Sequence, residues 1–163
     1  MKKIIIVSIL SVFVLYAKSQ NKFGHINAQE ILMLMPEAKK ADAAIKEQDK
    51  NIKTALEGML AEMQSIEANY KQNEANYNDA QKQDELAKYQ AIADRIQLYE
   101  RTAYADLEKL QADLLAPIEK KLQDAINEVA KEEGFTYIFA DGFMHYKDEN
   151  NNIGDMVKQK LGL

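Results

Sequence analysis

Apolar side chains recur at steps of three, four or seven residues along two separate stretches in the middle of the chain. The first stretch consists of Ile45, Ile52, Leu56, Met59, Met63, Ile66 and Tyr70. The second consists of Leu86, Tyr89, Ala93, Ile96, Tyr99, Ala103, Leu107, Leu110, Leu114, Ile118, Leu122 and Val129. This spacing places the apolar side chains on one face of an α-helix, and Lys, Glu, Gln and Asn fill most other positions. The pattern predicts two long helices, each with one apolar seam.

Four asparagines crowd the segment between the two helical stretches: Asn69, Asn73, Asn76 and Asn78. Asparagine competes for backbone hydrogen bonds and tolerates turns, so the segment predicts the tip of a hairpin. Residues 37–72 and 80–117 would each extend roughly 55 Å at about 1.5 Å per residue. The matching lengths predict an antiparallel coiled-coil hairpin.

A short β segment and a first helix precede the hairpin. Residues 22–27 read as a strand, and Asn27 with Glu30 forms a capping-box pattern that starts a helix. Pro36 fits only the first turn of a helix, so we expect one helix to end and the long helix to begin there.

The second long helix is expected to continue past Pro117 to Glu133, where Gly134 provides a left-handed C-cap. Residues 135–140 are rich in β-favouring side chains. Asp141-Gly142 before residues 143–146 is a two-residue hairpin signal that predicts a third strand.

A last helix is expected from a cap at residues 152–155 to about Leu161. The fold class is therefore mainly α with a small β body. A sheet of two or three short strands is marginal in water, so we expect obligate self-association.

The first nineteen residues have the pattern of a cleaved signal peptide. Lys2 and Lys3 precede an apolar run from Ile4 to Leu15, and small residues follow at Ala17 and Ser19. The apolar run is shorter than the about 20 residues that span a bilayer, which disfavours a membrane anchor. We therefore expect export, with one mature domain at 20–163. Its body comprises residues 20–36 and 117–163, and its helical arm comprises residues 37–116.

Charge and composition exclude several function classes. Removing Lys2, Lys3 and Lys18 from 21 basic residues leaves 18 against 26 acidic ones, a net charge of −8. Such a chain is a poor candidate for binding nucleic acid or anionic lipid. With 0 Cys, it has no disulfide and no thiol chemistry.

Candidate catalytic chemistry is sparse. The two histidines, His25 and His145, have no ligand-spaced neighbours, so we expect solvated or packed side chains at both positions. No phosphate loop, serine elbow or nucleotide motif is present. We therefore expect no enzyme activity, no cofactor and no metal site.

Three segments resemble the OmpH/Skp-like family of periplasmic chaperones, in the same order around a long charged hairpin. They are Gly24–Asn27 with Ile31-Leu32 and Pro36–Ala38, then Leu115–Ile118 leading to Gly134-Phe135, and finally Phe139–Asp141 with the closing Asp155–Val157 helix. The resemblance implies a trimer in the periplasm, in which short strands combine into an intersubunit barrel and three hairpins surround a cavity. Unfolded outer-membrane proteins would be held there without ATP.

One departure concerns charge. The best-known members of the family are basic, whereas this chain is acidic, which disfavours contact with membrane or lipopolysaccharide. A second reading stays open, in which the protein is a structural or partner-binding coiled coil of the cell envelope that uses its tip.

The candidate client-binding residues lie in the outer half of the hairpin: Met59, Leu60, Met63, Ile66, Tyr70 and Tyr77. Methionine adapts to varied partners, which suits a promiscuous binder. Alternatively these residues complete the seam, and the two tyrosines close the turn. Gly58 is either a hinge or a tolerated small residue. The candidate residues of the oligomeric β body are Ile26, Phe135, Tyr137, Phe139 and Phe143.

Overall fold

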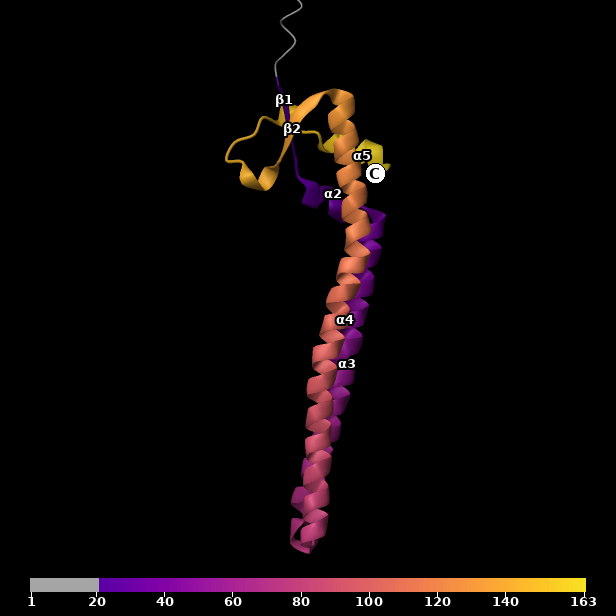
Figure 1. Cartoon of the computed structure of the whole chain (residues 1–163), viewed down its shortest axis with the longest axis vertical. Helices are drawn as coiled ribbons and strands as arrows, with labels where there is room; N and C mark the ends of the chain where they lie inside the picture. Colours follow the sequence, from indigo (N-terminus) through magenta and orange to yellow (C-terminus); the bar gives the residue numbers. More distant parts are fainter. Residues whose placement is uncertain (1–20) are drawn as a thin grey trace, which may run out of the picture. The chain divides into compact units, whose positions relative to one another are not determined.

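The computed structural model describes residues 21–163, and the signal peptide expected at 1–19 lies outside the described residues. The elements are β1 (Lys22–Ile26), α2 (Ala28–Leu34), α3 (Pro36–Asn73), α4 (Asp79–Glu133), β2 (Phe135–Ala140) and α5 (Gly154–Leu161), with 3₁₀ turns at Glu74–Asn76, Asp141–Phe143 and Glu149–Asn151 (Figure 1). The chain divides into two compact units. We call residues 36–118 the hairpin unit, and residues 21–35 with 119–163 the β unit. The mainly helical fold with a small sheet is the predicted class.

The hairpin unit is held together by the predicted seam between α3 and α4. Ile52 is completely buried and packs with Ala103 and Leu107. The side chains that pack around this cluster are Ile45, Leu56, Tyr99 and Leu110. Because long isolated helices gain most of their stability from tertiary packing, this seam is what keeps both helices formed.

The seam prediction is wrong near the tip, where Leu86 is 66% and Tyr89 38% exposed. The inward-facing line of α4 runs through Ile92, and steps of three or four residues toward the tip lead to Glu85 and Lys82. Those two charged side chains are half-buried. Leu86 lies one position beside this line, so its side chain is left in solvent.

The hairpin tip falls where the asparagines predict it. A 3₁₀ turn follows α3, and α4 begins at Asp79. Asn78 and Gln81 cap α4 reciprocally, since each backbone N–H donates to the other's side-chain oxygen at 2.9 Å. Two orphan backbone donors at the start of α4 are thereby satisfied.

The β unit contains one two-stranded sheet among the described residues, in which β1 and β2 are parallel. Phe23 pairs with Tyr137 and His25 with Phe139. Antiparallel neighbours can be joined by a tight turn, but parallel strands need a long crossover. Here the connection between the two strands comprises α2, α3 and α4.

The predicted third strand at 143–146 is wrong. The chain turns into a 3₁₀ turn at Asp141–Phe143, in which the Met144 N–H donates to the Asp141 carbonyl at 3.2 Å. A two-residue hairpin of the expected type needs positive φ, but the positive-φ glycines of the described residues are Gly134 and Gly162, not Gly142. The Asp141 side chain instead bonds to His25 and Lys147.

The predicted helix boundaries agree closely with the structure. The Asn27 side chain accepts from the Glu30 N–H at 3.1 Å at the start of α2, and Pro36 begins α3. Gly134 ends α4 with φ of 70°. The Asn152 side chain accepts from the Gly154 N–H at 2.9 Å, where α5 begins. Within residues 21–163, no helix has an apolar stretch long enough to cross a membrane.

The apolar seam between α3 and α4 predicts how a substitution in it changes the stability of the protein. Ile52→Ala should lower the free energy of unfolding by about 2 to 5 kcal/mol, because it leaves a cavity at the completely buried centre of the cluster with Ala103 and Leu107. The control is Leu98→Ala, since Leu98 lies in α4 of the same unit and is 53% exposed. Urea unfolding of both variants at equal protein concentration measures the difference. An equal, small effect for both variants would contradict the seam.

Candidate functional site

The outer part of the hairpin unit contains a pocket of about 330 Å³. Ile66 and Tyr70 of α3 line it together with Leu86 and Tyr89 of α4. The polar side chains around it are Glu67, Lys82, Gln83 and Glu85. The pocket exists because the inward line of α4 carries charged residues at this level, which do not fill the space between the helices. An apolar interior with a charged rim suits an apolar side chain of an extended polypeptide. We call it the tip pocket.

Two of the six predicted client-binding residues, Ile66 and Tyr70, line the tip pocket. Leu60 is 41% exposed, whereas the other five residues are half-buried: Met59, Met63, Ile66, Tyr70 and Tyr77. Sequence reasoning missed Leu86 and Tyr89, which it assigned to the seam. The signal that could have found Leu86 is its offset from the buried line through Ile92.

The two tyrosines near the tip contact one another, with ring centroids 6.2 Å apart and ring planes at 46°. The Tyr70 hydroxyl donates to Glu74 Oε1 at 3.4 Å. Burial raises the pKa of the Tyr70 phenol, and the Glu74 carboxylate raises it further. Because Tyr77 follows the 3₁₀ turn, this ring pair closes the turn, which supports the alternative role considered for these residues.

Exposed apolar side chains extend along the hairpin unit beyond the tip pocket. They are Leu60, Leu98 and Tyr104. Ion pairs also lie on the helix surfaces: Lys46 with Asp42 at 2.7 Å, Lys53 with Asp49 at 2.6 Å, and Arg95 of α4 with Glu62 of α3. The exposed faces of the hairpin unit therefore carry both apolar and charged side chains.

Gly58 lies inside α3, where a Cβ at this position would meet nothing within 4 Å. Its φ is not positive, so the helix does not require a glycine there. The hinge role of Gly58 stays a prediction, and the residue is a point of weakness in an otherwise continuous helix.

Three aromatic rings pack on the sheet of the β unit and remain about half exposed. The Phe23 ring centroid lies 5.8 Å from that of Tyr137 and 6.2 Å from that of Phe139, and Tyr137 and Phe139 are 6.3 Å apart. Their exposed fractions are 47%, 57% and 47%. We call these residues the aromatic face. Sequence reasoning named Tyr137 and Phe139 and missed Phe23, whose pairing with Tyr137 depends on the parallel register.

The other predicted residues of the oligomeric body differ in exposure. Ile26 is buried within its own unit at 3% exposed, and Phe135 is half-buried with the Lys22 ammonium 4.1 Å from its ring centroid. Phe143 is 92% exposed. Beside β2 lies a groove of about 420 Å³, whose apolar lining residues are Ile26, Ala28, Ile126, Ala130, Phe135, Tyr137, Ile138, Phe139 and Ala140.

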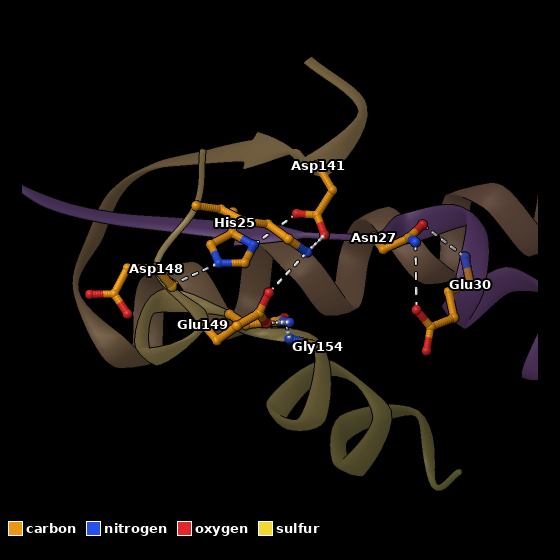
Figure 2. Close-up of polar contacts among 9 residues, drawn as sticks. His25, Asn27, Glu30, Asp141, Asp148, Glu149 and Gly154 are labelled. Carbon is orange, nitrogen blue, oxygen red and sulfur yellow. Dashed lines mark hydrogen bonds and ion pairs between the residues drawn. The ribbon is translucent and has the colours of Figure 1, made fainter. Parts of the chain in front are cut away.

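A buried polar cluster around His25 was not expected from the sequence. His25 is 2% exposed, its Nδ1 lies 2.8 Å from Asp141 Oδ1, and its Nε2 lies 3.0 Å from the Asp148 carbonyl oxygen (Figure 2). Lys147 Nζ donates to Asp141 Oδ2 at 2.6 Å and lies 3.3 Å from Glu149 Oε1. His145 is exposed. The partners of His25 lie more than a hundred positions away in the chain, so sequence spacing carried no signal for them.

The electrostatics of this cluster follow from its contacts. Burial acts to raise the pKa of the Asp141 carboxyl, but hydrogen bonds from Lys147 and His25 outweigh it and leave that pKa below its ordinary value. The hydrogen bond to Asp141 raises the pKa of the Lys147 ammonium. The hydrogen bond from Asn152, followed by that from Lys147, lowers the pKa of the Glu149 carboxyl. Across residues 21–163, no group of three or more His, Cys, Asp or Glu side chains is placed to hold a metal ion.

The hairpin unit has exposed apolar side chains, and the β unit has an exposed aromatic face. Residues 22–161 match the model of a family described as outer membrane protein (OmpH-like), and the chain belongs to that family. It is a family of chaperones.

The solved structures show the same fold. A protein from Caulobacter crescentus CB15, described as an outer membrane chaperone (OmpH-like), matches with a TM-score of 0.76 and 14% sequence identity. The match covers 89% of this chain and 86% of that one. At this identity the likeness shows the fold alone. No curated protein matches the chain.

The open space around Gly58 predicts the effect of adding a side chain at this position. Gly58→Ala should raise the free energy of unfolding by about 1 kcal/mol, because alanine restricts the unfolded chain and its Cβ meets no neighbour. Urea unfolding measures the change, with Gly134→Ala as the contrasting variant, because Gly134 has a φ of 70° and should lose stability on substitution. A loss of stability in Gly58→Ala would show that the position is constrained.

Proposed function

We propose that the protein is an exported, ATP-independent holdase that binds unfolded outer-membrane proteins in the periplasm and prevents their aggregation. The observation that carries this proposal is the apolar surface left exposed along the hairpin unit, including the tip pocket. Membership of the OmpH-like chaperone family supports the class of activity. The predicted signal peptide supports export.

The mechanism follows from the kind of contact that this surface offers. Leu60, Leu86 and Leu98 present separate apolar side chains rather than one continuous patch. Each contact with a client is weak and non-directional, so a bound chain stays mobile while its own apolar segments are shielded from other copies. Release needs no nucleotide, because folding of the client removes the apolar segments that hold it.

The aromatic face supports self-association through the β unit. A two-stranded sheet is marginal alone, and Phe23, Tyr137 and Phe139 leave about half of their surfaces in solvent. Covering these rings and the groove beside β2 with further copies of the chain would complete a larger β structure. We propose a trimer, as in the architecture that the family resemblance implies, with the client held between the hairpins of the three subunits.

A second candidate is a coiled-coil protein of the cell envelope that engages a folded partner through its tip. The tip pocket favours it, since one well-formed apolar pocket can receive a single anchoring side chain. Contact with lipopolysaccharide or membrane is disfavoured by the excess of acidic over basic residues.

The holdase proposal predicts suppression of aggregation. A urea-unfolded outer-membrane barrel is diluted into buffer with the mature protein at one trimer per client, and light scattering is followed. Leu86→Gln should weaken client binding about tenfold, because burying an exposed leucine contributes about 1.5 kcal/mol. Its control is Met33→Gln in α2, since Met33 is 60% exposed but lies in the other unit.

No suppression by the wild-type protein would contradict the holdase. Suppression that is unchanged in Leu86→Gln would remove the tip pocket from client binding. Binding of a folded envelope protein that is lost in Leu86→Gln would favour the second candidate.

The assembly proposal predicts that Phe139→Asp dissociates the oligomer, because it would bury a charge where the aromatic face is covered. Leu34→Asp is the matched control, since Leu34 is 43% exposed in the same unit but outside the aromatic face. Sedimentation equilibrium gives the mass of each variant. An unchanged mass for Phe139→Asp would remove the aromatic face from the interface.

A further inference from the structure

His25 occupies an unusual position in the β unit. It is the only buried polar or charged residue among those that the structure describes. Its backbone carbonyl also accepts a hydrogen bond from the Ile153 N–H at 3.0 Å, and it forms a bridge with Asn152. His25 therefore joins β1 to three separate points of the segment that follows β2: Asp141 at its start, Asp148 in its middle and Ile153 at its end.

Both ring nitrogens of His25 face oxygen atoms. A backbone carbonyl can only accept a hydrogen bond, and so can an ionised carboxylate. Asp141 is held ionised, because hydrogen bonds from Lys147 and His25 keep its pKa below the ordinary value. A neutral imidazole has one N–H and can donate to one of the two oxygens, whereas the doubly protonated ring can donate to both. Both hydrogen bonds of the His25 ring can therefore form only when the ring is doubly protonated and charged.

The charges around the ring agree with this reading. Asp141 and Glu149 carry negative charge, Lys147 lies between them, and Asp141 shares its two oxygens between Lys147 and His25. The Asp148 carboxylate accepts from the Asn150 N–H, so only the backbone carbonyl of Asp148 meets the ring. With the ring charged, two anions face two cations. With the ring neutral, one negative charge is left without a counterpart.

We propose that His25 is a pH-sensitive latch. It attaches the segment of residues 142–152 to strand β1. While both ring nitrogens carry protons, the ring donates to Asp141 and to Asp148, and the segment is held at both places. When the ring loses a proton as the pH rises, one donor becomes a lone pair facing an oxygen, that hydrogen bond is lost, and the segment is held more weakly. The proposal does not depend on the chaperone activity.

The latch controls an exposed aromatic element. Phe143 is 92% and Tyr146 85% exposed, and both lie between the two anchoring residues Asp141 and Asp148. Their presentation to any partner therefore depends on the state of His25. A rise in pH would loosen this element while leaving the seam of the hairpin unit unaffected.

The test is hydrogen exchange of the mature chain at pH 5.5 and 8.5, corrected for the intrinsic exchange rate. Amides from 142 to 153 should lose protection roughly ten- to a hundredfold at the higher pH, the effect of losing one hydrogen bond to a charged group. Amides around Ile52 serve as the internal reference and should not change. Asp141 and Lys147 keep their charges across this range, because their pKa values are shifted away from it.

Two variants test whether His25 causes the change of protection with pH. His25→Gln cannot titrate, so its segment should show the same protection at both pH values. His145→Gln is the matched control, because His145 is exposed within the same segment, and the pH effect should persist in it. This control also leaves His25 as the single histidine of the mature chain.

Nitrogen-15 NMR of the imidazole in His145→Gln then follows the latch directly, even where His25→Gln folds poorly. We expect both ring nitrogens to carry protons at low pH. One of these protons should be lost over the same pH range in which the segment loses protection. The proposal is overturned by a pH effect that persists in His25→Gln, by a segment equally protected at both pH values, or by a ring with one bare nitrogen at pH 5.5.

Discussion

The structure depends on one apolar seam between two helices of 38 and 55 residues. Helices of this length are not stabilised by their own hydrogen bonds alone, and packing around Ile52, Ala103 and Leu107 provides what they lack. Because the seam uses one narrow face of each helix, the remaining faces are free to carry ion pairs and isolated apolar side chains. In the proposed function, these remaining faces are the surface that shields an unfolded chain.

The β unit leaves apolar surface exposed, because its two-stranded sheet is too small to bury the aromatic rings that lie on it. The two parallel strands bury Ile26 but leave Phe23, Tyr137 and Phe139 about half exposed. Within the unit, His25 links β1 to the segment after β2 through polar contacts rather than through a third strand. The sheet therefore keeps apolar rings in solvent, where another copy can cover them.

Much of the architecture is predictable from the sequence because it rests on local rules. The helix starts at Asn27 and Pro36, the asparagine-rich tip and the Gly134 cap all follow from residues close to one another in the chain. The prediction of a third strand was wrong because it used only the local sequence, in which Asp141-Gly142 fits a hairpin turn. In the structure the Asp141 side chain bonds to Lys147 and to His25, and His25 is distant in the sequence.

The functional surfaces were predictable only in part, for the same reason. Ile66 and Tyr70, which periodicity assigned to the seam, line the tip pocket. The exposure of Leu86 depends on a one-position offset that appears only when the line through Ile92 and Glu85 is known. Phe23 joins Tyr137 and Phe139 because the strands are parallel, and periodicity cannot give strand direction. Membership of the OmpH-like family gives the class of protein, while these contacts define the exposed apolar side chains on which the proposed binding rests.

The central claim is that several copies of this chain together enclose one unfolded client. Native mass spectrometry of the mature protein mixed with a urea-unfolded outer-membrane barrel measures this directly. The account predicts a soluble complex of three subunits with one client, and no such complex with the folded barrel. A single subunit that stays monomeric and forms no complex with the unfolded barrel would contradict it.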